Sequence, residues 1–372
     1  MVWPTTHIGF GRFLYEGGST MSTQQLFHQR DLVHFATEAL AARGVPRTDA
    51  DLTARSLVQA DQRGIYSHGL LRLPLYCEAL RLGGINPRPS LKFSKDEGSV
   101  AVLDADAALG QVAMQAAVER VISVGRAQGI AAVAVHNSSH FGAGAFWSDL
   151  LAEAGFMSFI TSSTGPVVAP HGGTSKVLGT NPLTLGVPSS SGWPLTADLA
   201  TSNGAYGKVI AAKNEGTQLP EGWAVDAHGN PTTDPFEAEK GSMIPFGGHK
   251  GSAVAVLLEA FAASLTDATY AFETIDIWSN PASRMNNGHL VIGLDTAAFG
   301  GSAHTASRVA TLQDRVRSSG PAGQPVDAPG DPERRRQADA AEAVPLPAST
   351  ISQLDALAKE LSLSPLKTHS TT

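Results

Sequence analysis

The sequence predicts a mixed α/β fold that has helical segments at both ends of the chain. Apolar residues recur at helical spacing in the first and last parts of the sequence. Between these parts, short apolar runs that are typical of strands alternate with helical patterns. No internal repeat of about 20 to 50 residues is present, so a repeat architecture is not expected. These patterns together indicate a sheet that is covered by helices.

The elements follow one another in an order that their periodicity indicates. Two helices are predicted near the start, the first ended by Gly44 and the second capped by Thr48. Helices are predicted over residues 23–43, 48–61, 111–126, 141–155, 252–265, from about 303, and over 349–366. Strands are predicted over residues 99–110, 130–137, 155–163, 177–188 and 289–295. Residues 318–336 are expected to be a surface connection, with the RRR sequence at its end on a solvated helical face.

Composition and charge narrow the function classes. The chain has 372 residues, of which 42% are hydrophobic and 16% charged, as in an ordinary globular protein. A net charge of −7 gives no positive field for nucleic acid or anionic lipid, so a small molecule is the expected partner. The single cysteine, Cys77, excludes an internal disulfide, fits a cytoplasmic location and is expected to be buried.

The first residues do not have the pattern of a targeting segment. Residues 1–22 lack both the basic start and the apolar core of a signal peptide, and we expect them to be a flexible extension. Translation starting at Met21 instead of Met1 is a hypothesis consistent with this. No run of about 18 apolar residues predicts a membrane span.

The motif SHGLLR places a histidine and an arginine close together. Arg72 follows His68 by four residues, so both are expected on one helical face, one turn apart. A histidine exchanges a proton at neutral pH, and an arginine binds a carboxylate through two hydrogen bonds. The motif therefore indicates a general acid next to an anion clamp, with Ser67 beside the histidine. Simple capping of a helix by the SHG sequence is the alternative.

A second histidine lies in the motif VHNSSHFGAG, where a predicted strand gives way to a predicted helix. Such a turn exposes backbone N–H groups to an anion, with His140 at its edge. Ordinary capping by Ser138 and Ser139 is the alternative. His136 and His140 are four residues apart, but no further cysteine or acidic pair completes a ligand set, so no metal is expected.

The motif PFGGHKGSA is the strongest local indication of a phosphate site. Gly247, Gly248 and Gly251 allow close backbone approach, Lys250 adds a charge, and the apolar helix begins directly after them. Tight helix packing is the other explanation for the glycines. Neither GxxxxGK[ST] nor GxGxxG occurs, so an ordinary Rossmann domain is not expected.

Two further motifs, GTNPLTLGVP and DLATSNGAYGKV, place polar side chains near turns. These side chains are Thr180, Asn181, Asp198, Thr201 and Lys208. Each is weak evidence alone, because such residues cap turns in many proteins. Together with the histidine motifs they indicate one cleft, in which Asp198 is a candidate to bond a ribose or an amide.

The five motifs, in this order, closely resemble the malate/L-lactate dehydrogenase family of the second type over about residues 23 to 360. That family differs in fold from the classical lactate and malate dehydrogenases. It includes ureidoglycolate and sulfolactate dehydrogenases, diketogulonate reductase and piperideine/pyrroline-2-carboxylate reductases. The resemblance implies hydride transfer between NAD or NADP and a 2-hydroxy acid or its 2-oxo acid.

The resemblance also implies an architecture: a non-Rossmann mixed-sheet NAD(P)-binding domain with helical segments from both termini, in a homodimer whose active site lies near the interface. We accordingly expect an N-terminal helical region carrying SHG over residues 23–100. A cofactor and substrate domain should cover residues 101–300, and a C-terminal helical region residues 301–372.

Roles for individual residues follow from the same resemblance. His68 corresponds to the proton donor, polarised by Ser67, although one branch of the family gives the acid/base role to the position of His140. Arg72 and Thr180 correspond to substrate contacts. The implied cofactor contacts are His140, Phe141, Gly142, Asp198, Leu199, Ala200, His249, Lys250, Gly330 and Arg334.

The substrate branch is indicated by Lys208. Reductases of cyclic imines have an aspartate at this position, whereas a lysine, here counted with the substrate-binding residues, resembles the branch that acts on hydroxy acids. The favoured substrates are therefore 2-hydroxy acids of the malate, lactate, sulfolactate or ureidoglycolate type. PFGGHKGSA is closer to the imine and sulfolactate branches, so a cyclic 2-imino acid reductase remains the alternative. A non-catalytic anion-binding or assembly protein would not need the histidines, Arg72 and Lys250 together.

Overall fold

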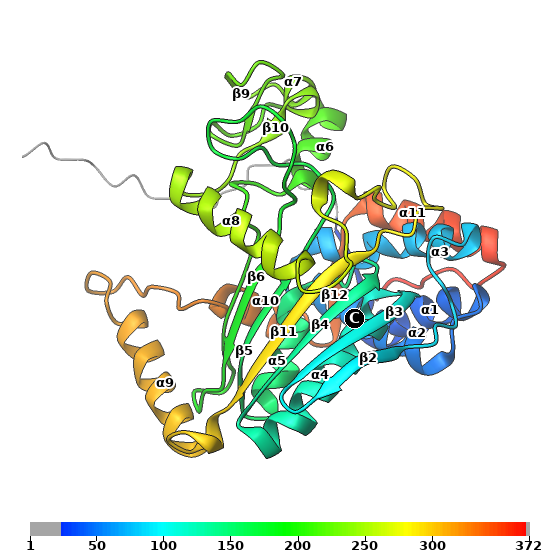
Figure 1. Ribbon diagram of the computed structural model, residues 1–372. Helices are drawn as coiled ribbons and strands as arrows, with labels where there is room; N and C mark the ends of the chain where they lie inside the picture. Colours follow the sequence, from blue (N-terminus) through cyan, green and yellow to red (C-terminus); the bar gives the residue numbers. More distant parts are fainter. Residues whose placement is uncertain (1–23, 370–372) are drawn as a thin grey trace, which may run out of the picture.

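A seven-stranded mixed sheet is the centre of the computed structural model, which describes residues 24–369 (Figure 1). Its strands follow the order β2-β3-β4-β11-β5-β6-β7. The β3–β4 pairing is parallel and the other pairings are antiparallel, which confirms the predicted mixed, non-Rossmann sheet. The strands are β2 (Lys92–Glu97), β3 (Val100–Ala108), β4 (Ile130–Ser138), β5 (Phe156–Ser162), β6 (Leu183–Val187), β7 (Leu195–Leu199) and β11 (Asn287–Asp295).

Helices cover both faces of this sheet. On one face, α4 (Gly110–Gln128) and α5 (Gly144–Glu153) bury an apolar layer that includes Trp147 and Ile160. On the other face lies α8 (Gly248–Ala263), where Phe261 meets Phe159 with ring centroids 6.1 Å apart. Phe159 and Ile160 are consecutive residues of β5, so they point to opposite faces of the sheet and each meets a different helix layer.

Segments from the two ends of the chain form a separate helical layer beside the sheet. Strands β1 (Gln25–His28) and β12 (Ala343–Leu346) pair antiparallel. In Figure 1 the early helices, in blue and cyan, lie next to the red helix α11. These helices are α1 (Gln29–Ala42), α2 (Arg47–Gln62), α3 (Leu73–Leu82) and α11 (Ala348–Leu361), and they share one buried apolar core. The expected packing of both ends together is therefore confirmed.

A small sheet extends from the top of the view in Figure 1. Its strand order is β10-β8-β9, and it has its own apolar cluster around Val168 and Met243. The elements are α6 (Tyr206–Glu215), β8 (Ala224–Val225), β9 (Pro231–Thr232), α7 (Pro235–Lys240) and β10 (Ser242–Met243). Short strands among dense turns agree with the Gly- and Pro-rich sequence of this region.

Three local predictions were wrong. The predicted first helix begins as strand β1, because residues 25–28 pair with β12. The hydroxyl of Thr48 does not cap α2, whose N-cap residue is Pro46. The predicted connection over residues 318–336 contains the start of α10 (Asp331–Asp339), which follows α9 (Ser302–Arg317). The Gly-Asp-Pro start of α10, with Pro in its first turn, was a helix signal that the polar composition hid.

The N-terminal extension, the absence of a membrane span and the burial of Cys77 were also predicted from the sequence. The predicted extension over residues 1–22, with the Met21 start, lies outside the described residues. Within residues 24–369, no helix has both the length and the apolar character needed to cross a membrane. Cys77 is fully buried on α3, as predicted, and burial raises the pKa of its thiol to about 12.

Candidate active site

The SHG motif lies between α2 and α3 in two short 3-10 turns, Tyr66–His68 and Leu70–Arg72. The buried carboxylate of Asp61 accepts a hydrogen bond from the backbone N–H of Leu70 over 2.8 Å. A Cβ at Gly69 would lie 1.9 Å from Oδ1 of Asp61, so only glycine fits there. The expectation that His68 and Arg72 share one face of a single helix is therefore wrong, since they lie in separate 3-10 turns and Arg72 only precedes α3.

Ser67 links the imidazole and the guanidinium of this motif. Its hydroxyl lies 2.9 Å from Nδ1 of His68, and its carbonyl accepts a hydrogen bond from Nε of Arg72 over 2.5 Å. Burial, followed by the positive charge of Arg72, lowers the pKa of His68 to about 4. The imidazole is therefore neutral at pH 7.

Arg72 is a cation without a carboxylate partner in residues 24–369. The ion pairs of the described chain do not include it, and burial lowers the pKa of its guanidinium. A partly buried charge without a counter-ion is costly, so such a group favours binding an anion from solution. Because Nε already bonds Ser67, the two Nη atoms are the donors that face an incoming anion.

His140, at the β4–α5 turn, stacks on His68 with ring centroids 5.4 Å apart. Its Nδ1 accepts a hydrogen bond from the backbone N–H of Gly142 over 3.3 Å and lies 2.6 Å from the hydroxyl of Tyr76. A backbone amide can only donate, so the proton of neutral His140 is on Nε2. Burial and the neighbouring His68 keep the pKa of His140 well below its usual value. Tyr76, one turn after Arg72, was not among the predicted site residues.

Neither serine of the NSSH turn caps α5. Ser138 bonds Nε2 of the buried His289 over 2.9 Å, and Ser139 contacts the sulfur of Met285. The second nitrogen of His289, Nδ1, bonds Ser162 over 2.9 Å. His289, on the neighbouring strand β11, therefore holds the turn that carries His140 in place. Its position inside a strand gave no sign of this in the sequence.

Asp198 occupies the N-terminus of α5. Its Oδ2 accepts a hydrogen bond from the N–H of Ala145 over 2.9 Å, and its Oδ1 accepts one from Thr184 over 2.7 Å. The Ala145 amide, expected to be open to an anion, is thus bonded to the protein's own carboxylate. The adjacent Leu199 and Ala200 are exposed, and all three remain predicted cofactor contacts.

The TNP motif and the DLATSN motif lie next to each other, and the single cleft expected around them stays a prediction. The carbonyl of Thr180 accepts a hydrogen bond from the N–H of Thr201 over 2.8 Å. The amide of Asn181 donates to the buried carboxylate of Glu259 on α8 over 2.6 Å. Lys208 lies further along, on α6, with Nζ 5.7 Å from the ring centroid of Trp223. The bond from Asn181 to Glu259 attaches the loop that carries Thr180 to α8.

The start of α8 supports both explanations of its glycines. Gly247 and Gly248 have φ of 63° and 61°, in the left-handed region that favours glycine. A Cβ at Gly251 would lie 1.6 Å from the carbonyl oxygen of Phe246, which shows tight packing. His249 and Lys250 are exposed in the first turn, and no side chain caps the helix. The first amides of α8 therefore lack a side-chain acceptor.

Two predicted cofactor residues lie on α10. Gly330 is its N-cap residue, with φ of 89°, and Arg334 donates to the buried carboxylate of Asp149. Arg63 also bonds this carboxylate, so Asp149 lies between two guanidinium groups. The guanidinium of Arg334 thus already has an internal partner, and its predicted cofactor contact stays a prediction.

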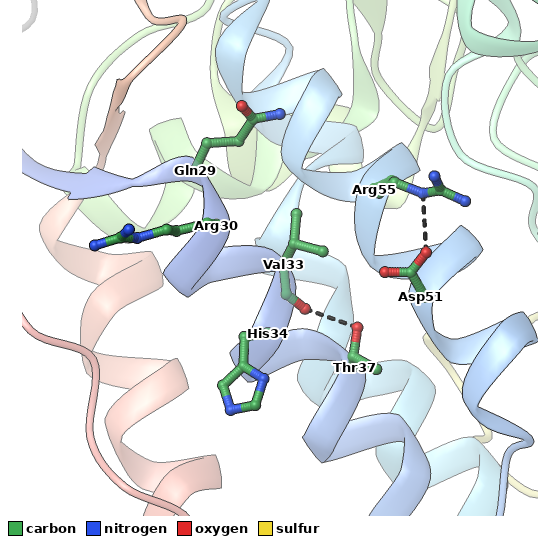
Figure 2. A pocket seen from close by; sticks show the side chains of 7 residues that line it. All are labelled: Gln29, Arg30, Val33, His34, Thr37, Asp51 and Arg55. Carbon is green, nitrogen blue, oxygen red and sulfur yellow. Dashed lines mark hydrogen bonds and ion pairs between the residues drawn. The ribbon is translucent and has the colours of Figure 1, made fainter.

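A groove of about 420 Å³ lies elsewhere, along α1 and α2 (Figure 2). Figure 2 shows the ion pair of Arg55 with Asp51, 3.1 Å apart, on one wall. The groove is lined by Gln29, Arg30, Val33, His34, Thr37, Asp51 and Arg55. None of these was predicted as a site residue, and the histidine pair of the SHG and SSHFG motifs does not line it.

Comparisons with known proteins show the family of the chain. The family model described as malate/L-lactate dehydrogenase matches residues 27–355. The L-sulfolactate dehydrogenase of Methanocaldococcus jannaschii is 35% identical over 327 residues, covering 88% of this chain and 94% of its own length. The Delta(1)-pyrroline-2-carboxylate reductase of Ancylobacter novellus is 34% identical over 325 residues, covering 86% and 94%.

A solved structure has the same fold. The sulfolactate dehydrogenase from Methanocaldococcus jannaschii superposes with a TM-score of 0.85 at 34% identity, covering 91% of this chain and 98% of that one. The matched range contains the Ser67–His68–Arg72 cluster, His140 and the start of α8. The predicted resemblance and the oxidoreductase class are confirmed, and the chain belongs to the malate/L-lactate dehydrogenase family.

Proposed function

We propose that the protein transfers a hydride between a nicotinamide cofactor, NAD or NADP, and a 2-hydroxy acid or its 2-oxo acid. One observation carries the proposal: Arg72, a cation without an acidic partner in the described chain, is joined through Ser67 to the neutral imidazole of His68. A carboxylate on the guanidinium would place its neighbouring carbon, and the oxygen on that carbon, beside a proton-transfer group.

The residues at the start of α8 fit a dinucleotide. Its first N–H groups have no side-chain cap, and Gly248 has open space where a Cβ would be. A phosphate would bind these amides, with Lys250 supplying a charge and His249 lying beside it. When bound, the nicotinamide supplies or accepts the hydride. No basic cluster beside a ribose separates NADP from NAD, and related proteins are named for each: NADP(+) for a sulfolactate dehydrogenase and NAD(+) for a ureidoglycolate dehydrogenase.

The chain's own groups bind, orient and move a proton. Arg72 holds the carboxylate through its Nη atoms, and Thr180 is the second proposed substrate contact. In oxidation, the neutral imidazole of His68 takes the hydroxyl proton, and in reduction it returns that proton to the oxygen. Ser67 bonds Nδ1 and so stabilises the changing charge of the ring. His140 offers its Nε2–H as a hydrogen-bond donor to the substrate or the nicotinamide end.

A hydroxy acid is the favoured substrate because Lys208, not an acid, follows the DLATSN motif. Reduction of a cyclic 2-imino acid is the second candidate, supported by the 34% identity to a pyrroline-2-carboxylate reductase. We also propose a cytoplasmic homodimer. The apolar side chains of Val256, Leu257 and Phe261 are exposed on α8, which suits burial against a second copy.

The test is a panel of oxidised substrates with NADH and NADPH: pyruvate, oxaloacetate, sulfopyruvate and piperideine-2-carboxylate. We expect turnover of at least one 2-oxo acid by the wild type, and a much higher KM for Arg72→Met. Arg72→Lys is the matched control, because it keeps the positive charge but cannot bind a carboxylate through two parallel hydrogen bonds. Turnover of the cyclic imine alone would establish the second candidate. Absence of turnover and of NADH binding would contradict an enzymatic role.

A further inference from the structure

We propose that Trp278 is a positioning residue that holds the Arg72 guanidinium in the plane in which it binds the substrate carboxylate. This inference rests on the proposed function of Arg72. Trp278 lies outside the sequence motifs of the site, in the segment between η3 (Ala271–Glu273) and β11.

The indole contacts two groups of the site at once. Cζ of Arg72 lies 4.8 Å from the ring centroid of Trp278, a cation–π distance. The same indole meets the ring of His140 edge-on, with centroids 5.3 Å apart and an interplanar angle of 85°. Trp278 therefore contacts both Arg72, the proposed carboxylate-binding residue, and His140, the second histidine of the site.

Two contacts restrict the guanidinium. The carbonyl of Ser67 accepts a hydrogen bond from its Nε over 2.5 Å, and its Cζ lies over the indole ring of Trp278. A guanidinium that is bonded through Nε and packed on an aromatic ring has restricted rotation, and its two Nη atoms remain as donors. A carboxylate binds in that plane and not on the face. The indole therefore leaves the binding edge open while it limits rotation of the side chain.

The Trp278 segment is anchored on both sides of the indole. Ile277, its neighbour, is fully buried in the core shared by the terminal helices. Asp276 forms a turn with Ser279, whose N–H donates to Oδ1 over 2.8 Å. A Cβ at Gly84, just after α3, would lie 2.1 Å from the carbonyl oxygen of Pro281, so the segment packs directly on that helix end.

These anchors explain how a partly exposed residue can position another. The indole is 42% exposed, so part of its surface is open to solvent while its backbone is held by the helical core. The same ring contacts both Arg72 and His140, so this partly exposed residue belongs to the cluster of site side chains.

The first experiment compares Trp278→Leu and Trp278→Phe with the wild type. A cation–π contact contributes about 0.5 kcal/mol at an exposed site and about 2 kcal/mol at a desolvated one, which corresponds to a roughly 2- to 30-fold change in binding. We expect Trp278→Leu to raise KM for the 2-oxo acid about 10-fold with a smaller change in kcat. Trp278→Phe keeps an aromatic face and should restore KM to within about threefold of the wild type.

Phe272→Leu is the matched control. Phe272 is a 59% exposed aromatic residue in the same part of the chain, and it stacks on Tyr270 instead of the site. We expect it to leave KM unchanged. Equal KM values for Trp278→Leu and Phe272→Leu would overturn the inference, as would an equal loss on an uncharged ketone, whose binding does not need Arg72.

Tryptophan fluorescence on ligand binding gives a readout that is independent of turnover. It uses Trp278→Phe, so the test does not depend on whether Trp278→Leu folds. Oxamate, an unreactive 2-oxo acid analogue, should change the emission of the wild type. The change should be lost in Trp278→Phe, although this variant still binds oxamate by calorimetry. A change that persists in Trp278→Phe would overturn the contact. If the wild type does not bind oxamate, the proposed function is contradicted instead.

Discussion

The hydroxyl of Tyr76 lies 2.6 Å from Nδ1 of His140, so a residue of α3 fixes the ring at the β4–α5 turn. Tyr76 is fully buried, and burial raises the pKa of its hydroxyl to about 12, so it stays protonated at neutral pH. Together with the Gly142 amide, it keeps the ring proton of His140 on Nε2.

Tyr76→Phe should therefore lower kcat by about fivefold to tenfold, since a hydrogen bond of this kind contributes about 1 kcal/mol. Steady-state assays at saturating substrate measure this change. Tyr66→Phe is the control, because the hydroxyl of Tyr66 meets only the exposed Gln24, 3.3 Å away. Equal losses in the two variants would show that the Tyr76 hydroxyl does not act through His140.

The pKa of His68 predicts a pH profile. Its pKa of about 4 means that the free enzyme keeps a neutral imidazole down to this pH. Oxidation of the hydroxy acid needs the neutral form, so kcat/KM for oxidation should fall as the pH falls through about 4, and stay level above it until another group titrates. At pH values above about 4, where the imidazole is neutral, His68→Ala should lower turnover by roughly two to four decades. Unchanged turnover would remove His68 from the mechanism.

Anion binding should change the protonation of the same imidazole. The positive charge of Arg72 helps to lower the pKa of His68, and a bound carboxylate would offset that charge. Oxamate binding near pH 5 should therefore take up protons, which calorimetry in two buffers of different ionisation enthalpy detects. Proton release, or the same uptake in His68→Gln, would contradict this linkage.

Asp61 makes the stability depend on pH. Burial raises the pKa of its carboxyl from 3.8 to about 8 in the folded protein, despite the hydrogen bond from Leu70. Because the pKa of Asp61 is higher in the folded than in the unfolded protein, Asp61 contributes to the free energy of unfolding fully below about pH 4. This contribution is lost as the pH rises towards 8. Asp61→Asn keeps an acceptor for the Leu70 amide, so its melting temperature should fall less between pH 5 and 8. Identical pH dependence in both proteins would show that Asp61 does not carry the effect.

Gly251→Ala should lower both the stability of the protein and its affinity for NADH, because both depend on the start of α8. A Cβ there would meet the Phe246 carbonyl oxygen at 1.6 Å, which forces the helix start to shift. Overpacking of this kind costs about 1 to 3 kcal/mol of stability, and NADH affinity should fall as well. Fluorescence titration with NADH measures the second effect. Gly207→Ala, which has no atom within 4 Å of its new Cβ, should leave both unchanged.

Local patterns predicted the elements that depend on their own sequence. Periodicity placed α4, α8, β5 and β11 to within a few residues, because each buries one continuous apolar face or core. It missed β2, whose residues Lys92–Glu97 are all exposed at the sheet edge. It also missed β1 as a strand, since β1 exists only through pairing with a segment more than 300 residues away.

The site divides in the same way. His68, Ser67, Arg72 and His140 were predicted because histidine and arginine stand out next to glycine, and the structure brings them together. The contacts of Tyr76 and Trp278 with them were not predicted, since an aromatic residue on a helix or in a loop is usually taken as packing until its neighbours are known. Asp198 and Arg334 show the opposite effect: polar residues expected to face a ligand bond the protein's own amide and carboxylate.

The pairing of β1 with β12 has a consequence for biosynthesis. Phe27 faces Val344 in this ladder, and the core around α1 to α3 includes Leu354 and Leu357 from α11. A ribosome delivers these partners only after almost the whole chain has been made. The loop that bears His68 and Arg72 thus acquires its final support last, and a nascent or C-terminally clipped chain would hold a nearly complete sheet without a working proton-transfer centre.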